Sequence, residues 1–196
     1  MAAGQGEAAF FRRFARRLSA EAGQFARSPK GTSDPPPAVR LSALSVYVLD
    51  TNVLSQVAPT KTAQNRSLST WLRRNGDYCY LSVVSVAEFS YGASWLARKG
   101  ASRKSIQLQA WIRSVLALHR DRILDIDEAV AVRSGELMAT GRANGAAVDI
   151  EDALIAASAD LRGMTVLTDN VRHFAPMAVA HLNPLRQLPP DVTRRE

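Results

Sequence analysis

The sequence predicts an α/β fold in which a short central parallel sheet of four or five strands is covered by helices on both faces, giving three layers. Two observations lead to this prediction. Short apolar segments alternate along the chain with longer segments of helical periodicity, which is typical of parallel strands joined by helical crossovers. The first short segment, residues 46–49, is apolar without interruption, as expected for a strand that is buried on both faces.

Length and composition fit one globular domain with some additional chain. The protein has 196 residues, of which 46% are hydrophobic and 22% are charged. Its one cysteine, Cys79, has no partner for an internal disulfide, which favours a reducing compartment, and we expect a cytoplasmic location. No apolar stretch approaches the roughly 20 residues that span a bilayer, so no contact with a membrane is expected from the core.

Residues 1–45 differ in character from the rest of the chain. They hold seven Lys and Arg against three acids, and Phe10, Phe14 and Leu18 fall at helical spacing among the arginines. A stretch with the composition of a linker, residues 28–37, follows. A basic amphipathic segment of this kind resembles a transit peptide or a membrane-surface helix. We favour the simpler interpretation, a start codon assigned too early, and exclude the segment from the fold.

The core domain is therefore expected over residues 46–190, with residues 191–196 as a short tail. Residues 46–196 hold 18 Lys and Arg against 15 acids. This part of the chain is only mildly basic, so its net charge gives weak support for a polyanionic partner.

The other elements follow from periodicity and from residues that favour helix ends. Thr51 and Asn52 are expected to cap a helix after the first strand, Ser82 or Ser85 the next, and Asp127 a later one. The expected strands are residues 46–49, 78–81, 122–125, 165–167 and 181–182. The expected longer helices are residues 63–74, 83–99, 106–116, 127–143 and 149–161.

Three acids are expected near the same edge of this sheet. Asp50 directly follows the first strand, at the carboxyl end where open α/β sheets bind ligands. Glu88 lies one turn into the helix after the second strand, where a solvated side chain is the ordinary explanation. Asp152, three residues after the helix cap Asp149, suits the positive end of a helix dipole. Asp152 also heads the stripe that must face the sheet, and a carboxylate there costs free energy unless it is paired or bound to metal.

The segment after the fourth strand is polar as well. Thr168, Asp169 and Asn170 stand where a parallel strand ends, and capping of the next turn explains them locally. Capping does not explain why each polar cluster falls on one edge of the sheet. Thr51, Asn52, Thr168 and Asp169 are therefore candidates for supporting the acids.

Carboxylates gathered at this edge repel one another, and a cation relieves the repulsion. A set of oxygen ligands favours Mg²⁺ or Mn²⁺ over zinc, and the three histidines have no metal-ligand spacing in the sequence. Such a metal can polarise a phosphoryl oxygen and supply hydroxide, while a spare carboxylate orients or deprotonates the attacking water. The acids thus favour hydrolysis of a phosphodiester.

Four motifs in a fixed order carry a resemblance to a known family. They are residues 49–53 (Leu-Asp-Thr-Asn-Val), 82–88, 152–157 and 167–174. In this order they resemble the PIN-domain family, specifically VapC-type toxins, over essentially residues 46–185. The resemblance implies a PIN fold with a protruding helical arm, a Mg²⁺-dependent ribonuclease activity and a cognate VapB-type antitoxin.

The resemblance also implies a set of site residues. It maps the three core acids of the family, as catalytic and metal-binding residues, onto Asp50, Glu88 and Asp152. The fourth acidic position of the family falls on Asn170, an amide, with Asp169 beside it. Whether Asn170 or Asp169 completes the site, and whether it holds one metal or two, is left open. Residues 1–45 have no counterpart in the family pattern.

Three other functions were weighed. A haloacid-dehalogenase phosphatase needs a second acid two residues after the first, where this chain has Asn52. A receiver-type phosphoacceptor needs a late lysine, and none follows Lys104. The serious alternative is a catalytically silent PIN-like protein that acts as an RNA-binding or regulatory subunit.

Basic and aromatic residues between the first and third strands suggest how partners bind. A basic rim there would hold RNA phosphates, although ordinary solvated surface explains the same residues. The candidates for RNA contact are Arg73, Arg74, Arg98 and Lys99. Trp71, Trp95 and Trp111 lie in the same helices and are expected to expose aromatic surface, which favours a homodimer and a bound antitoxin. The identity of the RNA is left open.

Overall fold

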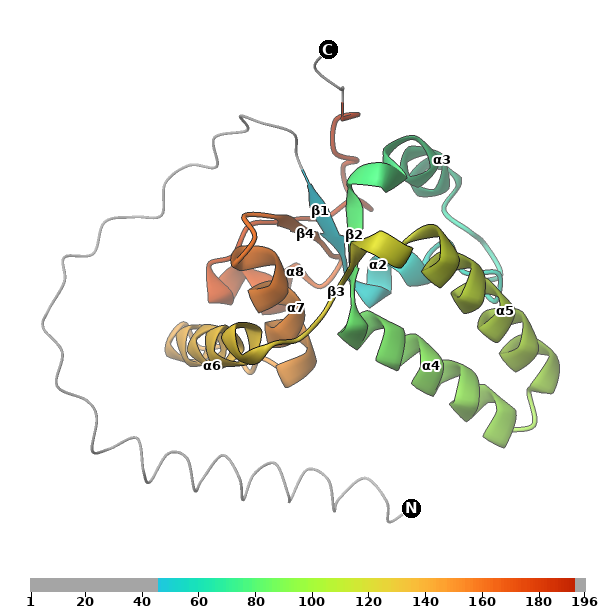
Figure 1. Ribbon diagram of the computed structural model, residues 1–196, viewed down its shortest axis with the longest axis horizontal. Helices are drawn as coiled ribbons and strands as arrows, with labels where there is room; N and C mark the ends of the chain where they lie inside the picture. Colours follow the sequence, from blue (N-terminus) through green and yellow to red (C-terminus); the bar gives the residue numbers. More distant parts are fainter. Residues whose placement is uncertain (1–45, 193–196) are drawn as a thin grey trace, which may run out of the picture. The chain divides into compact units, whose positions relative to one another are not determined.

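The computed structural model describes residues 46–192, and in this range the predicted α/β architecture with a parallel sheet is confirmed (Figure 1). The strand order is β3-β2-β1-β4-β5, and every neighbouring pair is parallel. The strands are β1 (Tyr47–Leu49), β2 (Cys79–Ser82), β3 (Ile123–Leu124), β4 (Thr165–Leu167) and β5 (His181–Leu182). The expectations for residues 1–45 and 193–196 lie outside the described residues.

The helices connect and cover these strands. They are α2 (Thr51–Ser55), α3 (Arg66–Asn75), α4 (Val83–Arg98), α5 (Ser102–Leu118), α6 (Glu128–Ala143), α7 (Ile150–Asp160) and α8 (Val171–Phe174). Two predicted caps are confirmed: the side chain of Ser82 accepts from the backbone N–H of Val84 at 3.2 Å, and that of Asp127 from Val130 at 2.8 Å. Both bonds satisfy amides that the first helical turn leaves unpaired.

The central strand β1 is apolar throughout because it is buried on both faces. Val48 belongs to the core under α6 and α7, whereas Tyr47 and Leu49 belong to a second core that includes Leu54 and Trp71. Successive side chains of a strand point to opposite faces, so each face of β1 contributes to its own core. In Figure 1, α6, α7 and α8 lie on one side of the sheet and α2 to α5 on the other, which gives the three layers.

Helices α4 and α5 form the predicted arm, which extends past the sheet in Figure 1. Ala93, Leu108 and Ile112 share a small core with the rest of the pair. The buried Ser105 hydroxyl donates to the carbonyl oxygen of Ala93 at 2.7 Å. Gly100, with φ of 76°, allows the tight reversal between the two helices. The arm is thus held together by its own core.

The expectation that three tryptophans expose aromatic surface is wrong for two of them. Trp71 is 4% exposed and meets Tyr47 edge to face, with ring centroids 5.5 Å apart. Trp111 packs against Phe89 at 5.3 Å. Trp95, in contrast, is 47% exposed. The helices that carry the first two rings pack on the sheet and on each other, which the linear sequence does not reveal.

Among the described residues, no helix is both long enough and apolar enough to cross a bilayer. This agrees with the absence of a long apolar stretch in the sequence.

Gly141 allows α6 to lie close to the segment that leads into α7. A Cβ atom at this position would lie 2.6 Å from Cγ2 of Val148, a short side chain with little freedom to move away. Val148 in turn packs on the core that contains Ala153 of α7. The small residue in α6 therefore helps to position the start of α7.

We predict that Gly141→Ala destabilises the protein by roughly 1–3 kcal/mol through overpacking. Gly135→Ala is the matched control, because a Cβ at Gly135 in the same helix meets no atom within 4 Å. That substitution should stabilise by about 0.5–1 kcal/mol through helix propensity. Urea unfolding of both variants measures the difference, and equal effects would contradict the close approach.

Candidate active site

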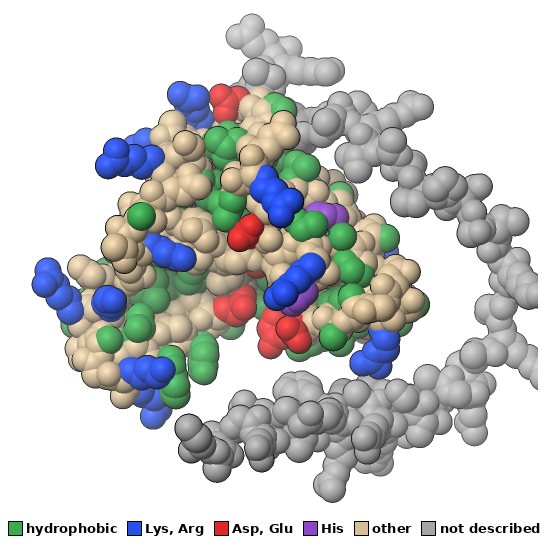
Figure 2. All heavy atoms as spheres, turned by 180° about the vertical axis from the view of Figure 1, so that it is seen from behind, with side chains coloured by type: hydrophobic (Ala, Val, Ile, Leu, Met, Phe, Trp, Pro, Cys, Tyr) green, Lys and Arg blue, Asp and Glu red, His purple; other side chains and the backbone are tan. Residues whose placement is uncertain are grey.

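The carboxyl ends of β1 and β4 and the first turns of α4 and α7 border one pocket of about 870 Å³. Side chains from all four segments reach it, although they are far apart in sequence. Figure 2 shows acidic side chains gathered in a hollow at this face, with Lys and Arg side chains around it. The charged and amide residues among the lining are Asp50, Asn52, Glu88, Asp149, Glu151, Asp152, Asn170 and His173.

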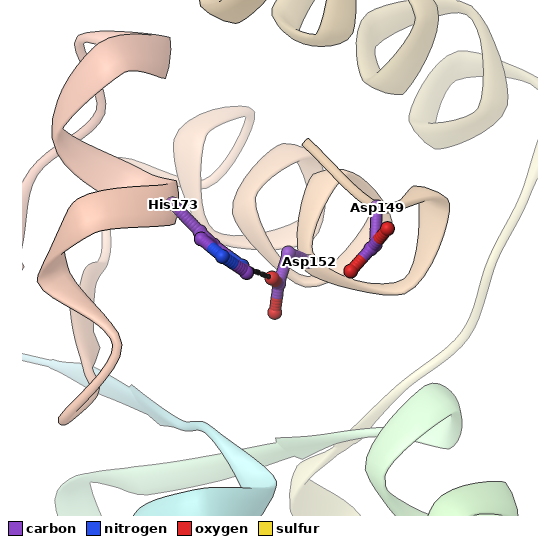
Figure 3. Close-up of side chains that lie close together, drawn as sticks. All are labelled: Asp149, Asp152 and His173. Atoms are coloured by element: carbon purple, nitrogen blue, oxygen red, sulfur yellow. Dashed lines mark hydrogen bonds and ion pairs between the residues drawn. The ribbon is translucent and has the colours of Figure 1, made fainter. Parts of the chain in front are cut away.

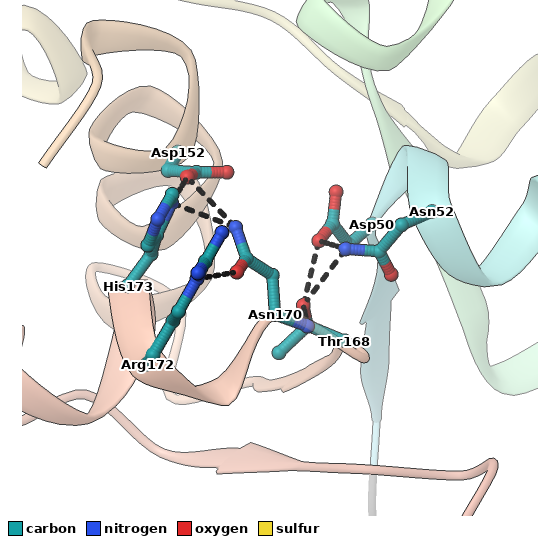
Figure 4. A network of polar contacts seen from close by, with 7 residues as sticks. All are labelled: Asp50, Asn52, Asp152, Thr168, Asn170, Arg172 and His173. Carbon is teal, nitrogen blue, oxygen red and sulfur yellow. Dashed lines mark hydrogen bonds and ion pairs between the residues drawn. The ribbon is translucent and has the colours of Figure 1, made fainter.

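Asp50 is the most deeply buried acid of the pocket, at 4% exposed. Its Oδ2 accepts from the hydroxyl of Thr168 at 2.7 Å and from Nδ2 of Asn52 at 2.6 Å (Figure 4). The side chain of Asn52 also joins β1 to β4, since its Oδ1 accepts from the backbone N–H of Asp169 at 2.9 Å. Both side-chain bonds to Asp50 fall on the same oxygen, which leaves Oδ1 for a cation.

The predicted capping role of Thr51 and Asn52 is wrong. Asp50 itself occupies the N-cap position of α2 and its side chain makes no capping bond. Thr51 instead donates its hydroxyl to Oε2 of Glu88 at 2.5 Å, and Asn52 holds Asp50. These short polar side chains thus hold site acids in place.

Burial raises the pKa of Asp50 from 3.8 to about 6. The hydrogen bond from Thr168 lowers this pKa, and the negative charges of Asp152 and Glu88 raise it further. Desolvation is the largest of these effects, so a single strong donor does not offset it. The carboxylate form of Asp50 is therefore unfavourable until a positive charge enters the pocket.

Glu88 reaches the pocket from the first turns of α4 and is more exposed than Asp50. Partial burial is the largest cause that raises its pKa, and the hydroxyl of Thr51 opposes this. The charges of Asp152 and Glu151 raise the pKa of Glu88 as well. The acids of the pocket are therefore close enough to repel one another.

Asp152 stands in the first turn of α7 and is tied to the loop after β4. Its Oδ2 lies 2.5 Å from Nδ1 of His173 and 3.5 Å from Nδ2 of Asn170 (Figure 4). The same ring nitrogen lies 2.7 Å from Nδ2 of Asn170. One nitrogen cannot donate and accept at once, and a carboxylate is the stronger acceptor, so we assign the Nδ1–H to Asp152. As in Asp50, the contacts fall on Oδ2.

His173 was missed as a site residue because its pairing with Asp152 is tertiary. Ligand atoms of Asp149, Asp152 and His173 all lie within 4.8 Å of one another, a spacing that suits a metal ion (Figure 3). Asp149 holds the N-cap position of α7 but makes no capping bond through its side chain, so the capping role expected for it is wrong. Asp50 and Glu88 lie outside this group of three.

Asn170 and Asp169 differ in where their side chains point. Asn170 lines the pocket, and its Oδ1 accepts from Nε of Arg172 at 3.2 Å. Asp169 is exposed, and its Oδ1 accepts from the amide of Asn183 at 2.9 Å, outside the pocket. Of the two, Asn170 is placed to complete the site.

The basic residues expected to bind RNA lie in two places. Arg73 and Arg74 of α3 line a different pocket of about 440 Å³, away from the acids. Arg98 and Lys99 lie at the far end of α4. The cation next to the acids is Arg172, which the sequence reasoning missed.

The family relationship follows from comparison with known proteins. The model of the PIN domain family matches residues 47–179. The chain belongs to the PIN-domain family, as the sequence motifs indicated.

Three known proteins are similar over most of their length. Toxin FitB of Neisseria gonorrhoeae is 31% identical over 140 residues, 71% of this chain and 98% of its own. Plasmid stability protein StbB of Pseudomonas syringae pv. tomato is 30% identical over 143 residues, with 71% and 98% covered. VapC ribonuclease Y4jK of Sinorhizobium fredii is 29% identical over 140 residues, with 71% and 97% covered.

Solved structures agree with this assignment. The crystal structure of FitAcB from Neisseria gonorrhoeae matches with a TM-score of 0.63 at 31% identity, over 71% of this chain and 99% of that chain. VapBC2 from Rickettsia felis, bound to a DNA fragment from their promoter, matches with a TM-score of 0.54 at 25% identity, over 70% and 98%.

We predict that Asp50→Asn stabilises the metal-free protein at neutral pH but not at acidic pH. The folded state binds the Asp50 proton more tightly than the unfolded state, because its pKa rises from 3.8 to about 6. The unfolding free energy of the wild type therefore falls between about pH 4 and pH 6 and stays lower above that range, by about 2–3 kcal/mol. Asparagine lacks this loss while its Oδ1 still accepts hydrogen bonds.

Urea unfolding in EDTA over a pH series measures this difference. Asp127→Asn makes the same chemical change at the start of α6, outside the pocket, and should give a pH profile parallel to the wild type. A constant difference between Asp50→Asn and wild type from about pH 4 to pH 7 would contradict the role of the buried carboxylate.

Proposed function

We propose that this protein is a Mg²⁺-dependent endoribonuclease of the VapC type, the toxin of a toxin–antitoxin pair, in which Mn²⁺ can replace Mg²⁺. The observation that carries the proposal is the group of mutually repelling acids at the carboxyl edge of the sheet. Support comes from a relative named a VapC ribonuclease and another named a toxin. A group of buried acids with raised pKa values, set in a pocket, is typical of a functional site.

The pocket fits a divalent cation by the chemistry of its donors. Asp50 and Asp152 each have one oxygen held by neighbouring groups and a second oxygen for the cation. We propose these two as the principal metal-binding residues, with Glu88 as the third. Asn170 completes the set with an amide. Magnesium prefers few protein ligands, all oxygens, and keeps several waters.

A bound Mg²⁺ ion would supply a polarised phosphoryl oxygen and a water of lowered pKa for attack on phosphorus. The residues of the chain do the remaining work. Thr168 and Asn52 hold Asp50 in place, and His173 holds Asp152. Glu88, whose pKa is raised, is suited to orient the attacking water and accept its proton. Arg172, beside Asn170, is suited to hold a phosphate of the RNA.

An antitoxin of the VapB type is the proposed protein partner. Solved structures of similar chains carry names of two-component assemblies, FitAcB and VapBC2. The pocket of about 440 Å³ between α3 and α5 offers apolar side chains to such a partner, among them Leu72, Trp111 and Val115. A cytoplasmic location, with RNA as the substrate, is part of this proposal.

A homodimer remains a proposal with narrower support than the sequence suggested. Trp71 and Trp111 are committed to the core, which removes two of the three side chains on which it rested. Leu118 of α5, which is largely exposed, is one apolar side chain left for a contact between copies.

The alternative is a catalytically silent PIN-like subunit that binds RNA or regulates another protein. The acids are all present and oriented, which favours cleavage. Magnesium binding without turnover of RNA would favour the alternative.

We predict that cleavage of RNA requires Mg²⁺ or Mn²⁺, stops in EDTA, and falls by at least about 100-fold in Asp152→Asn, because the change removes a ligand charge. The matched control is Asp127→Asn, the same change at a helix start outside the pocket, which should cleave like the wild type. Rates measured over a Mg²⁺ series test both variants. Wild-type cleavage by Asp152→Asn in limiting Mg²⁺ would remove Asp152 from the site.

We also predict that residues 46–192 suffice for folding and cleavage. The carbonyl oxygen of Val46 already accepts from the backbone N–H of Thr165 at 3.0 Å, so the sheet begins there. A chain that starts with Met placed before Val46 should unfold at nearly the wild-type urea concentration and cleave RNA at a similar rate. A large loss of either property would show that the first 45 residues contribute to the folded protein.

A further inference from the structure

The face of α4 that leads away from the acids carries a row of side chains at helical spacing. Glu88, Tyr91, Trp95 and Lys99 follow one another at intervals of three or four residues, so they lie on one side of the helix. Glu88 and Tyr91 line the acidic pocket, and Trp95 and Lys99 continue the row toward the far end of α4. Figure 2 shows hydrophobic and basic side chains on the arm beside the hollow that holds the acids.

The two aromatic rings in this row are exposed and nearly parallel. Tyr91 is 67% and Trp95 is 47% exposed. Their planes differ by 12°, with ring centroids 6.3 Å apart. Large exposed aromatic side chains cost solvation free energy, and core packing does not explain rings that lie outside the core of the arm. A flat surface of this kind suits another flat, apolar group.

The charge around the rings changes along the helix. Nζ of Lys99 lies 5.1 Å from the centroid of Trp95, and Arg98 is exposed beside it. The cations therefore stand at the end of the row far from the acids, where they can meet phosphates, while the rings separate them from Glu88. Alternating base-stacking and phosphate-binding groups is the pattern of proteins that bind single-stranded nucleic acid.

We propose that Tyr91 and Trp95 form a stacking platform for unpaired bases of the RNA next to the bond that is cleaved, with Arg98 and Lys99 on the neighbouring phosphates. This inference rests on the proposed ribonuclease function and adds its substrate class, single-stranded RNA. In a duplex the base faces are covered by their neighbours, whereas an unpaired base has a free face. A base on Trp95 lies roughly 10 Å along α4 from Glu88, so it belongs to a nucleotide near the acids.

The test compares Trp95→Ala with wild type on an unpaired oligoribonucleotide and on the same strand annealed to its complement. On the unpaired strand, KM should rise on the order of tenfold with kcat little changed. KM for the annealed strand should stay level. Trp95→Phe keeps a flat ring and should restore most of the KM. An unchanged KM on the unpaired strand would overturn the platform.

Ile106→Ala is the matched control. Ile106 is 65% exposed on the same arm but belongs to α5 and does not line the acidic pocket. Its loss should leave KM at the wild-type value. An equal rise in both variants would overturn the platform, as would a change in sedimentation of Trp95→Ala from dimer to monomer, which would make this face a contact between copies.

Binding measured in EDTA separates this inference from the proposed function. The dissociation constant of the unpaired oligoribonucleotide requires no turnover, and it should be about tenfold larger for Trp95→Ala. If wild type binds in this way but cleaves no RNA with Mg²⁺, the ribonuclease proposal fails and the platform stands. If wild type cleaves RNA and the two proteins bind equally, the platform alone fails. If wild type does neither, both are overturned.

Discussion

The buried carboxylate of Asp50, at the end of the central strand, is the constraint on which the rest of this site depends. Because β1 lies between β2 and β4, groups that follow both neighbouring strands come within reach of it. Thr168 follows β4 and donates to Asp50, and Glu88 of α4 follows β2 and repels it. The cost of burying this charge exceeds what the neighbouring donors return, which is why its pKa rises to about 6. The fold thus holds an arrangement that is unfavourable without a cation and suited to binding one.

The supporting structure keeps these acids from moving apart. Asn52 bonds to both Asp50 and the backbone after β4, so the two strand ends are held at a fixed separation. On the other side of the pocket, close packing between Gly141 and Val148 positions the segment before α7, and with it Asp152. Positioning of this kind lets repelling groups stay close, at the expense of stability in the absence of metal. The same trade is common where charged groups are gathered for chemistry.

Much of the fold could be predicted from the sequence because its signals are local. The short apolar strands, the caps at Ser82 and Asp127 and the position of Asp50 after β1 depend on neighbouring residues alone. The roles of Asn52, His173 and Trp71 depend on partners distant in the sequence. Asn52 after a strand is indistinguishable from a helix cap until Asp50 and β4 are placed around it. His173 lies 21 residues from Asp152, and Trp71 is buried because Tyr47 of β1 meets it edge to face.

The central claim is that the acids at the carboxyl edge of the sheet bind one divalent cation through Asp50 and Asp152. The most direct measurement is the anomalous scattering of crystals grown with Mn²⁺, which locates the ion without reference to activity. This account predicts a peak in contact with carboxylate oxygens of Asp50 and Asp152. A peak bound instead by Asp149, Asp152 and His173, the other group with suitable spacing, would contradict the assignment of Asp50. Crystals with no peak in the pocket would contradict the claim that its acids form a metal site.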